Sequence, residues 1–307
     1  MHRRRKAARM GQHQLAHVLP RHTDNLGNVG QSNQIRRHLD QLRRRHRTAH
    51  IGQRAAHGGA RIGRLAGELQ RQNYLQPLQI ELKGAGNLVT HVDRRCEELI
   101  SAMLLDTFPG DGYYGEENTR VRPDARRLWV VDPLDGTNNY AHGYPLFCVS
   151  VGLVVDRQPV VGVIYNPLLD ELYTAEVGKG AFLNGRPIHV SDTSELGSAL
   201  LASGFPYGVW DRLDDNLSEY QRMTKRAVSV RCDGCAAADL AHTAAGRLDG
   251  YWEQEIEPWD VAAGSLILAE AGGQVSLWDG RPFDVFGRSI LATNRHLHQP
   301  ILRELRA

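Results

Sequence analysis

Two aspartates three residues apart, Asp132 and Asp135, have the type and spacing that most clearly suggest chemistry in this chain. They stand in the stretch Asp-Pro-Leu-Asp-Gly-Thr, directly after the apolar run 128–131. Two carboxylates this close repel each other unless a positive charge lies between them. Oxygen ligands at this spacing suit Mg²⁺, which prefers carboxylates, water and phosphate oxygens. Taken alone, the stretch is equally compatible with an ordinary aspartate-rich turn.

Two further acidic sites flank this stretch at a distance. Upstream, Glu116 and Glu117 follow a glycine, and downstream Asp260 follows Glu-Pro-Trp and opens the apolar, helix-like run 261–269. In isolation, an aspartate at a helix start predicts an N-cap. The alternative is that all three sites fold into one metal-binding pocket.

The three acidic sites, in this order and with these neighbours, resemble the inositol monophosphatase family, which belongs to the Mg²⁺-dependent, lithium-sensitive phosphomonoesterases. The resemblance runs from about residue 50 to the end and includes both signature blocks, 132–137 and 258–273. It implies a layered α/β (α+β) fold, the five-layer αβαβα sandwich of the inositol monophosphatase and fructose-1,6-bisphosphatase type. It also implies a homodimer and one catalytic domain, 49–307, with a metal-binding half (49–190) and a substrate half (191–307).

The resemblance implies about two or three bound Mg²⁺ ions. Glu116, Asp132 and the backbone carbonyl of Leu134 would bind the first ion. Asp132, Asp135 and Asp260 would bind the second, and Glu116 would reach a third through water. An all-oxygen ligand set of this kind selects Mg²⁺ over zinc, which prefers His or Cys.

Catalytic and supporting roles also follow from the resemblance. Thr137 would orient the attacking water, and Asp93 could accept the proton of its hydroxyl; the alternative role for Thr137 is a helix cap. Lys83 occupies the family's lysine position and would stabilise the carboxylates, unless it is simply a solvated lysine. Glu117 would support the metal site without binding the metal directly. Asn87 stands where the family usually has Asp.

The substrate contacts implied by the resemblance fall into two sets. The phosphate would lie on Asp135, Gly136 and Thr137, where backbone N–H groups open a helix. The polyol hydroxyls would contact Gly234, Cys235, Ala236 and Glu253. Cys235 replaces a hydroxyl residue of the family and is a weaker hydrogen-bond partner. With Cys232 it also forms a Cys-x-x-Cys pattern, for which zinc binding, a redox-active pair and unreactive thiols all stay open.

Composition limits the class of protein. The chain has 307 residues, 41% apolar and 23% charged, enough to bury a large core. No uninterrupted apolar run approaches the roughly 18–20 residues that span a bilayer. The start lacks the apolar segment of a secretory signal, and four cysteines do not make a disulfide framework. We therefore expect a cytoplasmic enzyme with no membrane partner.

The first 48 residues differ sharply from the rest. They carry 11 Arg and 1 Lys against 2 Asp, a net charge of +10, so the remainder has a net charge of −8. Three interpretations stay open: a disordered basic arm that binds nucleic acid or acidic lipid, an organelle-targeting segment, and upstream sequence that is not native to the enzyme. The first supports an alternative from another class, an RNA-associated regulatory protein.

The hydrophobic pattern predicts the elements that must position these residues. We expect a helix near 51–70, a helix from Thr90 that ends at Pro109-Gly110, and a buried strand over 128–131 that stops at Pro133. We expect a hairpin of 147–155 with 160–165, strands at 172–175 and 180–183, and a turn at Asn184-Gly185. From residue 200 onward strands alternate with helices, and the last strand, 290–294, precedes a terminal helix.

The expected function is that of a phosphoric monoester hydrolase. Metal-activated water would hydrolyse a small polyol phosphate, with myo-inositol monophosphate as the favoured substrate. Histidinol phosphate and fructose 1,6-bisphosphate are the alternatives within the same superfamily.

Overall fold

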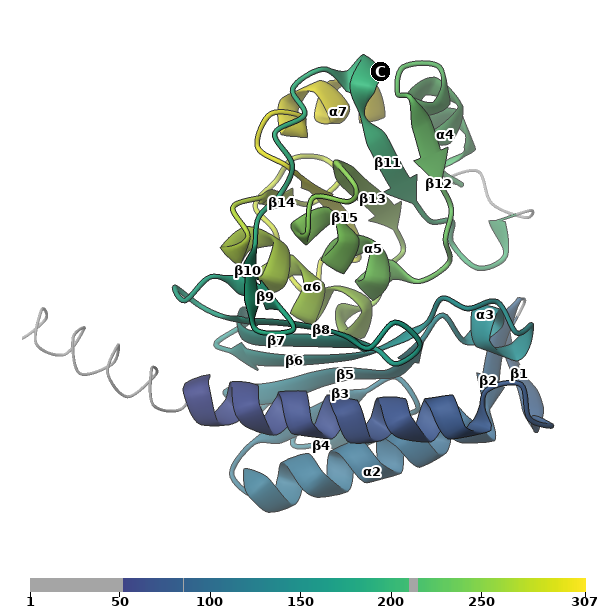
Figure 1. The fold of residues 1–307 in the computed structure, drawn as a ribbon, viewed down its shortest axis with the longest axis vertical. Coiled ribbons are helices and arrows are strands. Elements are labelled where there is room, and N and C mark those ends of the chain that lie inside the picture. Colours follow the sequence, from purple (N-terminus) through teal and green to yellow (C-terminus); the bar gives the residue numbers. More distant parts are fainter. Residues whose placement is uncertain (1–51, 85, 210–214) are drawn as a thin grey trace, which may run out of the picture. The chain divides into compact units, whose positions relative to one another are not determined.

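The computed structural model describes residues 52–84, 86–209 and 215–307 (Figure 1). The chain divides into two units, Met1–Arg47 and Thr48–Ala307. The basic segment 1–48 lies outside the described residues, and so do its expected roles. None of the helices in the described part of the chain is long and apolar enough to cross a membrane.

The second unit has five layers (Figure 1). Residues 52–73 and α2 (His91–Thr107) form an outer helical layer against an eight-stranded sheet. Helices α5 (Ala236–Ala244) and α6 (Pro258–Glu270) fill the middle, followed by a five-stranded sheet. Helices α4 (Leu217–Thr224) and α7 (His298–Leu305) form the last layer. The αβαβα sandwich expected from the sequence is confirmed.

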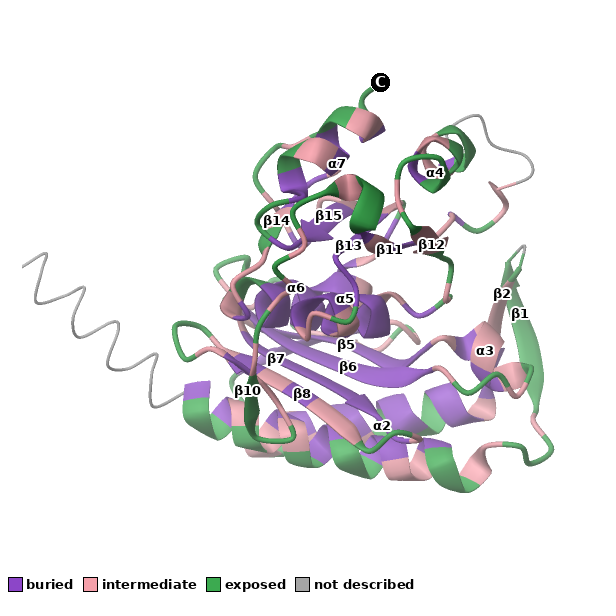
Figure 2. Ribbon diagram, turned by 45° about the horizontal axis from the view of Figure 1, so that its top comes forward, coloured by how far each residue is buried: buried purple, intermediate pink, exposed green. Residues whose placement is uncertain are grey.

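The eight-stranded sheet is mostly an antiparallel meander in the order β10-β9-β8-β7-β6-β5-β3-β4, with β3 parallel to β5. Figure 2 shows that its central strands are buried along their length, because helices cover both faces. Its strands are β3 (Gly112–Gly115), β4 (Arg120–Val121), β5 (Arg127–Asp135), β6 (Cys148–Val155), β7 (Gln158–Asn166), β8 (Glu171–Glu176), β9 (Ala181–Leu183) and β10 (Arg186–Ile188).

The five-stranded sheet has the order β12-β11-β13-β15-β14. Its strands are β11 (Leu200–Ser203), β12 (Ser229–Arg231), β13 (Gly250–Gln254), β14 (Gln274–Ser276) and β15 (Ser289–Thr293). The other short elements are the hairpin of β1 (Ile80–Gly84) and β2 (Asn87–Thr90), helix α3 (Thr137–Ala141) and the 3₁₀ turn η1 (Leu196–Ser198). The expected boundary after residue 190 falls between the two sheets, but the assignment of one half to metal and the other to substrate stays a prediction.

Local sequence signals explain most of these elements. Both predicted N-terminal helices are present, and α2 begins with a capping box in which Thr90 and Asp93 satisfy each other's backbone N–H groups. Asp156 and Arg157, with φ of 50° and 65°, form the two-residue turn between β6 and β7. The hairpin itself is confirmed, but its loop is shorter than expected because residues 158 and 159 belong to β7.

The prediction that the strand stops at Pro133 is wrong, because β5 continues to Asp135. Asp132 pairs with Ser150, and Asp135 pairs with Cys148, so three steps along β5 match two steps along β6. This extra residue is a β-bulge, a position that tolerates the missing N–H of proline within a sheet.

Helix α6 packs unusually close to the eight-stranded sheet. Gly152 of β6 and Gly162 of β7 lie directly opposite each other beneath it. A Cβ at Gly162 would lie 2.5 Å from the carbonyl oxygen of Ala263, and one at Gly152 would lie 2.8 Å from the Cβ of Ala262. The two glycines therefore set the height of α6 above the sheet.

Replacing Gly162 with Ala should destabilise the fold by about 1–3 kcal/mol, because the helix backbone must move away from the added methyl group. Chemical denaturation measures this change. The control is Gly110→Ala, where no atom lies within 4 Å of the added Cβ, and it should stay within about 0.5 kcal/mol of the parent protein. Equal stability of both variants would show that the glycine at position 162 is not needed for the close packing of α6 on the sheet.

Candidate active site

A pocket of about 460 Å³ contains most of the residues singled out in the sequence, a volume within the range of small-molecule sites. All the expected metal ligands and substrate contacts line it. Among the described lining residues, Arg288 is the one basic side chain, and its guanidinium pairs with Glu255 and Glu257. The lining carboxylates are Glu116, Asp132, Asp135, Asp239, Glu253, Glu255, Glu257 and Asp260.

The bulge in β5 explains how Asp132 and Asp135 both reach this pocket. An odd spacing places two side chains on opposite faces of a regular strand, and the extra residue of the bulge changes this alternation. The backbone N–H of Leu134 donates to Asp132 Oδ1 at 2.9 Å. The N–H of Ala237, in the first turn of α5, donates to Asp135 Oδ2 at 2.6 Å. Backbone donors therefore fix both carboxylates in position.

Glu116 reaches the pocket from the turn between β3 and β4. Its backbone N–H donates to the carbonyl of Val131 in β5 at 3.1 Å. Glu97 of α2 holds the same turn, accepting from the N–H of Glu117 at 2.8 Å. Lys83 lies 2.9 Å from Glu116 Oε1 and also donates to Glu117. The predicted contact of Lys83 with the carboxylates is therefore present, although neither Lys83 nor Glu117 lines the pocket.

Asp260 reaches the pocket from the first turn of α6. Its carboxylate accepts a hydrogen bond from the N–H of Glu257 at 2.9 Å. The reading of Asp260 as an N-cap is wrong, because Glu257 is the N-cap and Asp260 completes a capping box from the third helical position. The hydroxyl of Ser150 in β6 donates to the carbonyl of Trp259 at 3.1 Å and anchors this helix start to the sheet.

The carboxylates share one electrostatic environment although they come from separate segments. The pKa of Asp132 is raised well above its ordinary value, first by burial and then by the charges of Glu116, Asp135 and Asp260. Burial, with the charges of Asp135 and Glu116, also raises the pKa of Asp260 well above its usual range. The pKa of Asp135 rises to about 6, again chiefly through burial. A cation bound between these groups would relieve the repulsion.

Thr137 and Asp93 form the predicted pair beside the carboxylates. The Thr137 hydroxyl lies 2.8 Å from Asp93 Oδ1 and 2.9 Å from the carbonyl oxygen of Leu134. The other Asp93 oxygen accepts from the N–H and the hydroxyl of Thr90, at 2.9 and 2.5 Å. Asp93 is fully buried. Because one of its oxygens is held in the capping box of α2, the other oxygen has a fixed position from which it orients the Thr137 hydroxyl. Thr137 is the first residue of α3, and Gly136 is its N-cap.

Glu253, at the end of β13, faces the pocket from the opposite sheet. Tyr251 donates a hydrogen bond to its carboxylate. Burial raises the pKa of Glu253 to about 8, and the charge of Asp135 adds to the rise. The carboxyl group of Glu253 therefore belongs to the pocket wall.

The sequence analysis missed Asp239 as a site residue. It lies in α5 beside the pocket, is buried, and its Oδ1 has no hydrogen-bond partner among the described residues. Burial, with the charges of Asp233 and Asp135, raises its pKa well above the usual range. The available signal was a lone carboxylate inside the apolar run Ala-Ala-Ala-Asp-Leu-Ala, where an unpaired acid is costly.

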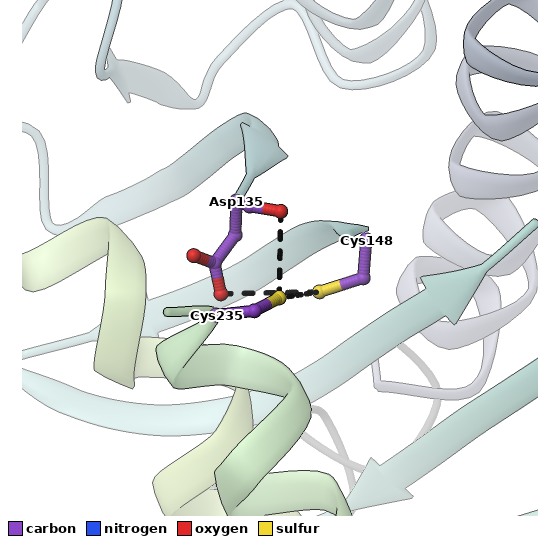
Figure 3. Close-up of side chains that lie close together, drawn as sticks. All are labelled: Asp135, Cys148 and Cys235. Atoms are coloured by element: carbon purple, nitrogen blue, oxygen red, sulfur yellow. Dashed lines mark hydrogen bonds between the residues drawn. The ribbon is translucent and has the colours of Figure 1, made fainter. Parts of the chain in front are cut away.

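The two thiols of the Cys-x-x-Cys pattern lie in different environments. Cys232 is exposed and Cys235 is buried, and both are free. Burial raises the pKa of each thiol. Cys235 instead lies against Cys148 of β6, with the two sulfur atoms 3.6 Å apart (Figure 3).

Comparison with known proteins assigns this site to a family. The inositol monophosphatase family profile matches residues 56–307. The chain belongs to the inositol monophosphatase family. An inositol-1-monophosphatase from Synechocystis sp. is 45% identical over 251 residues, 81% of this chain and 85% of that protein. Inositol monophosphatase 2 of Solanum lycopersicum is 43% identical over 247 residues, 78% of this chain and 93% of that protein.

Solved structures agree with this assignment. The inositol monophosphatase from Anabaena (Nostoc) sp. PCC 7120 is 42% identical, with a TM-score of 0.76 over 83% of this chain and 96% of that chain. The extragenic suppressor protein suhB from Bartonella henselae is 38% identical, also with a TM-score of 0.76. Inositol monophosphatases are metal-dependent phosphoric monoester hydrolases that generally use Mg²⁺, so this chain is a phosphatase of that type.

The raised pKa of Glu253 predicts that the metal-free protein loses stability as pH rises from about 5 to 8. Folded Glu253 keeps its proton up to about pH 8, whereas an unfolded glutamate releases it near pH 4.3. The folded state therefore binds more protons across this range, and the free energy of unfolding falls by up to about 1.4 kcal/mol per pH unit for one such group.

Thermal and chemical unfolding in a chelator, at several pH values, measures this slope. The Glu253→Gln variant should show a shallower slope than the parent protein, because it carries no proton to lose. The same slope in both proteins would contradict the assignment of a raised pKa to Glu253.

Proposed function

We propose that this chain hydrolyses a small polyol phosphate monoester in a Mg²⁺-dependent reaction, with myo-inositol monophosphate as the favoured substrate. The observation that carries the proposal is the convergence of Glu116, Asp132, Asp135 and Asp260 on one pocket, where burial and the neighbouring charges raise the pKa of Asp132 and of Asp260. Holding several acids together in this way is costly unless cations fill the site.

The donor chemistry of the site fits Mg²⁺. Every expected ligand atom is an oxygen, supplied by carboxylates and by the carbonyl of Leu134, and hard oxygen ligands are those that Mg²⁺ prefers. Glu116, Asp132 and Leu134 would hold one ion, Asp132, Asp135 and Asp260 a second, and Glu116 would contact a third through water. When bound, the ions lower the pKa of water and neutralise the phosphate charge.

Thr137 and Asp93 would orient the attacking water. The Thr137 hydroxyl can donate to Asp93 Oδ1 at 2.8 Å, which leaves its oxygen lone pairs available to accept a hydrogen bond from a water molecule. Asp93 is held by Thr90, so the direction of the Thr137 hydroxyl is set before substrate binds. Lys83 would limit the repulsion around Glu116, and Glu117 would support that contact.

The substrate would lie between the two sheets. Its phosphate would contact Asp135, Gly136 and Thr137, and its hydroxyls would contact Gly234, Cys235, Ala236 and Glu253, all of which line the pocket. The Cys235 thiol lies 3.4 Å from the carbonyl oxygen of Asp135 and can donate its hydrogen bond there. The backbone of Cys235 is therefore better placed than its thiol to contact a substrate hydroxyl.

The preference for inositol phosphate is supported by the relatives, which are named as inositol monophosphatases. Histidinol phosphate and fructose 1,6-bisphosphate stay as alternatives because the same carboxylates would serve them. We also propose that the enzyme is inhibited by lithium, forms a homodimer and is located in the cytoplasm. The RNA-associated alternative depends on residues 1–48, which lie outside the described residues, and nothing in the pocket favours it.

A phosphate-release panel tests the proposal. With Mg²⁺ present, we expect the largest kcat/KM for myo-inositol monophosphate among inositol, histidinol, fructose and nucleotide phosphates. Asp132→Asn should lower the Mg²⁺-dependent rate by about 100-fold or more, since even groups that only support a metal ligand cost about 10- to 100-fold when removed. Phosphate release without any dependence on divalent cations would contradict the proposal.

Thermal unfolding provides the control for the Asp132→Asn variant. Mg²⁺ should raise the midpoint of the parent protein and of Asp279→Asn, an exposed position, but have a smaller effect on Asp132→Asn. Without metal, Asp132→Asn should be at least as stable as the parent protein, because one buried repelling charge is gone. A metal-free fold that is grossly destabilised would show that Asp132 has a structural role instead.

Thr137 provides a separate test of the water-orienting pair. Thr137→Ser keeps the hydroxyl and should retain most activity, whereas Thr137→Val should lower kcat by about 100-fold or more. KM and the Mg²⁺-induced shift in unfolding midpoint should change little in either variant. Equal kcat values for the Ser and Val variants would remove the hydroxyl from the mechanism.

A further inference from the structure

Three buried side chains, Asp135, Cys148 and Cys235, lie close together beside the pocket. The proposed mechanism gives no role to this cluster. Asp135 lies at the end of β5, Cys148 at the start of β6 and Cys235 at the N-cap of α5. Figure 3 shows both thiols directed toward each other and toward Asp135. The two sulfur atoms are 3.6 Å apart, and Cys148 Sγ lies 3.9 Å from Asp135 Oδ2.

These distances match those between ligands of one tetrahedral ion. Thiolates about 2.3 Å from a zinc ion at the tetrahedral angle lie about 3.8 Å from each other. In this cluster the two Sγ atoms and one carboxylate oxygen of Asp135 all lie within 4.8 Å of one another. Only small side-chain movements would therefore bring three ligands to bonding distance of a common centre.

The chemistry of this set differs from that of the Mg²⁺ ligands. Two sulfur atoms and one oxygen select a thiophilic ion of the zinc class, whereas Mg²⁺ binds oxygen. The register of the sheet places two of these ligands side by side, because Cys148 is the residue that pairs with Asp135 across the bulge. Helix α5 is tied to the same carboxylate through the N–H of Ala237, which places Cys235 beside it.

We propose that Asp135, Cys148 and Cys235 form an inhibitory site for one thiophilic divalent cation such as Zn²⁺ or Cd²⁺. Both cysteines would coordinate as thiolates, with their two protons released to the buffer. The bound ion would take the Asp135 carboxylate away from the Mg²⁺ set, so its occupancy would lower phosphatase activity. This effect on activity rests on the proposed function, whereas the binding itself does not.

The pocket gives the ion a route to this site. Asp135 and Cys235 line the pocket, and Cys148 lies behind them, fully buried. A water molecule in the pocket could supply the fourth ligand. Cys232 also lines the pocket, but it is exposed and is not a member of the ligand cluster. It therefore provides a matched control thiol in the same loop as Cys235.

Direct binding is the first test. The full chain, without Mg²⁺ and with a phosphine reductant, is titrated with Cd²⁺, and thiolate-to-cadmium charge-transfer absorption in the ultraviolet is recorded. We expect one strong site in the parent protein and in Cys232→Ser, and affinity weaker by about tenfold or more in Cys148→Ser and Cys148→Ala. Equal spectra and affinities in the Cys148 and Cys232 variants would overturn the proposal, as would absence of a thiolate signal in the parent protein.

Inhibition is the second test, measured as phosphate release at fixed Mg²⁺ with increasing Zn²⁺. Cys148→Ser should need about tenfold or more Zn²⁺ for half inhibition, while Cys232→Ser should match the parent protein. Zn²⁺ inhibition that is unchanged in Cys148→Ser would contradict the inhibitory role. If the parent protein released no phosphate, the proposed function would fail, but the cadmium spectra would still decide whether the thiol site exists.

Discussion

Repulsion among buried carboxylates is the constraint on which the rest of this structure depends. Eight acidic side chains and a single guanidinium, already paired with two glutamates, line the described pocket. Burial makes the charges of Asp132 and Asp260 costly, and the nearby carboxylates add to the cost, which is why the pKa values of these two groups rise so far. The fold must supply enough stability elsewhere to hold these groups together until cations neutralise them.

The scaffold meets this constraint with hydrogen bonds that position the acids without neutralising them. Backbone N–H groups orient Asp132, Asp135 and Asp260, and the donors lie in β5, in the first turn of α5 and at the N-cap of α6. The close packing of α6 on the paired glycines Gly152 and Gly162 fixes the distance between the α6 start and the sheet. Both devices lower the freedom of the carboxylates, so that the site is organised before any ligand binds.

Much of this arrangement could be predicted from the sequence. Hydrophobic periodicity and capping signals located the helices, and the family resemblance supplied the five layers and the pocket residues. Three features were not predicted. The bulge at Pro133 depends on pairing with β6, which a single strand sequence does not reveal. The contact of Cys235 with Cys148 joins residues far apart along the chain, which the short spacing of a Cys-x-x-Cys pattern does not reveal. Asp239 was missed because it lies within a helix-like run, although an unpaired acid in such a run is costly.

The bulge between Asp132 and Asp135 also makes the number of residues in this segment matter as much as their identity. Because the bulge determines which way the second carboxylate points, adding or removing one residue there would turn Asp135 to the other face of β5 and break its pairing with Cys148. Changes of chain length at this point are therefore expected to be less tolerable than most single substitutions. Libraries meant to alter the specificity of this enzyme should vary residue types around the pocket and keep the segment length fixed.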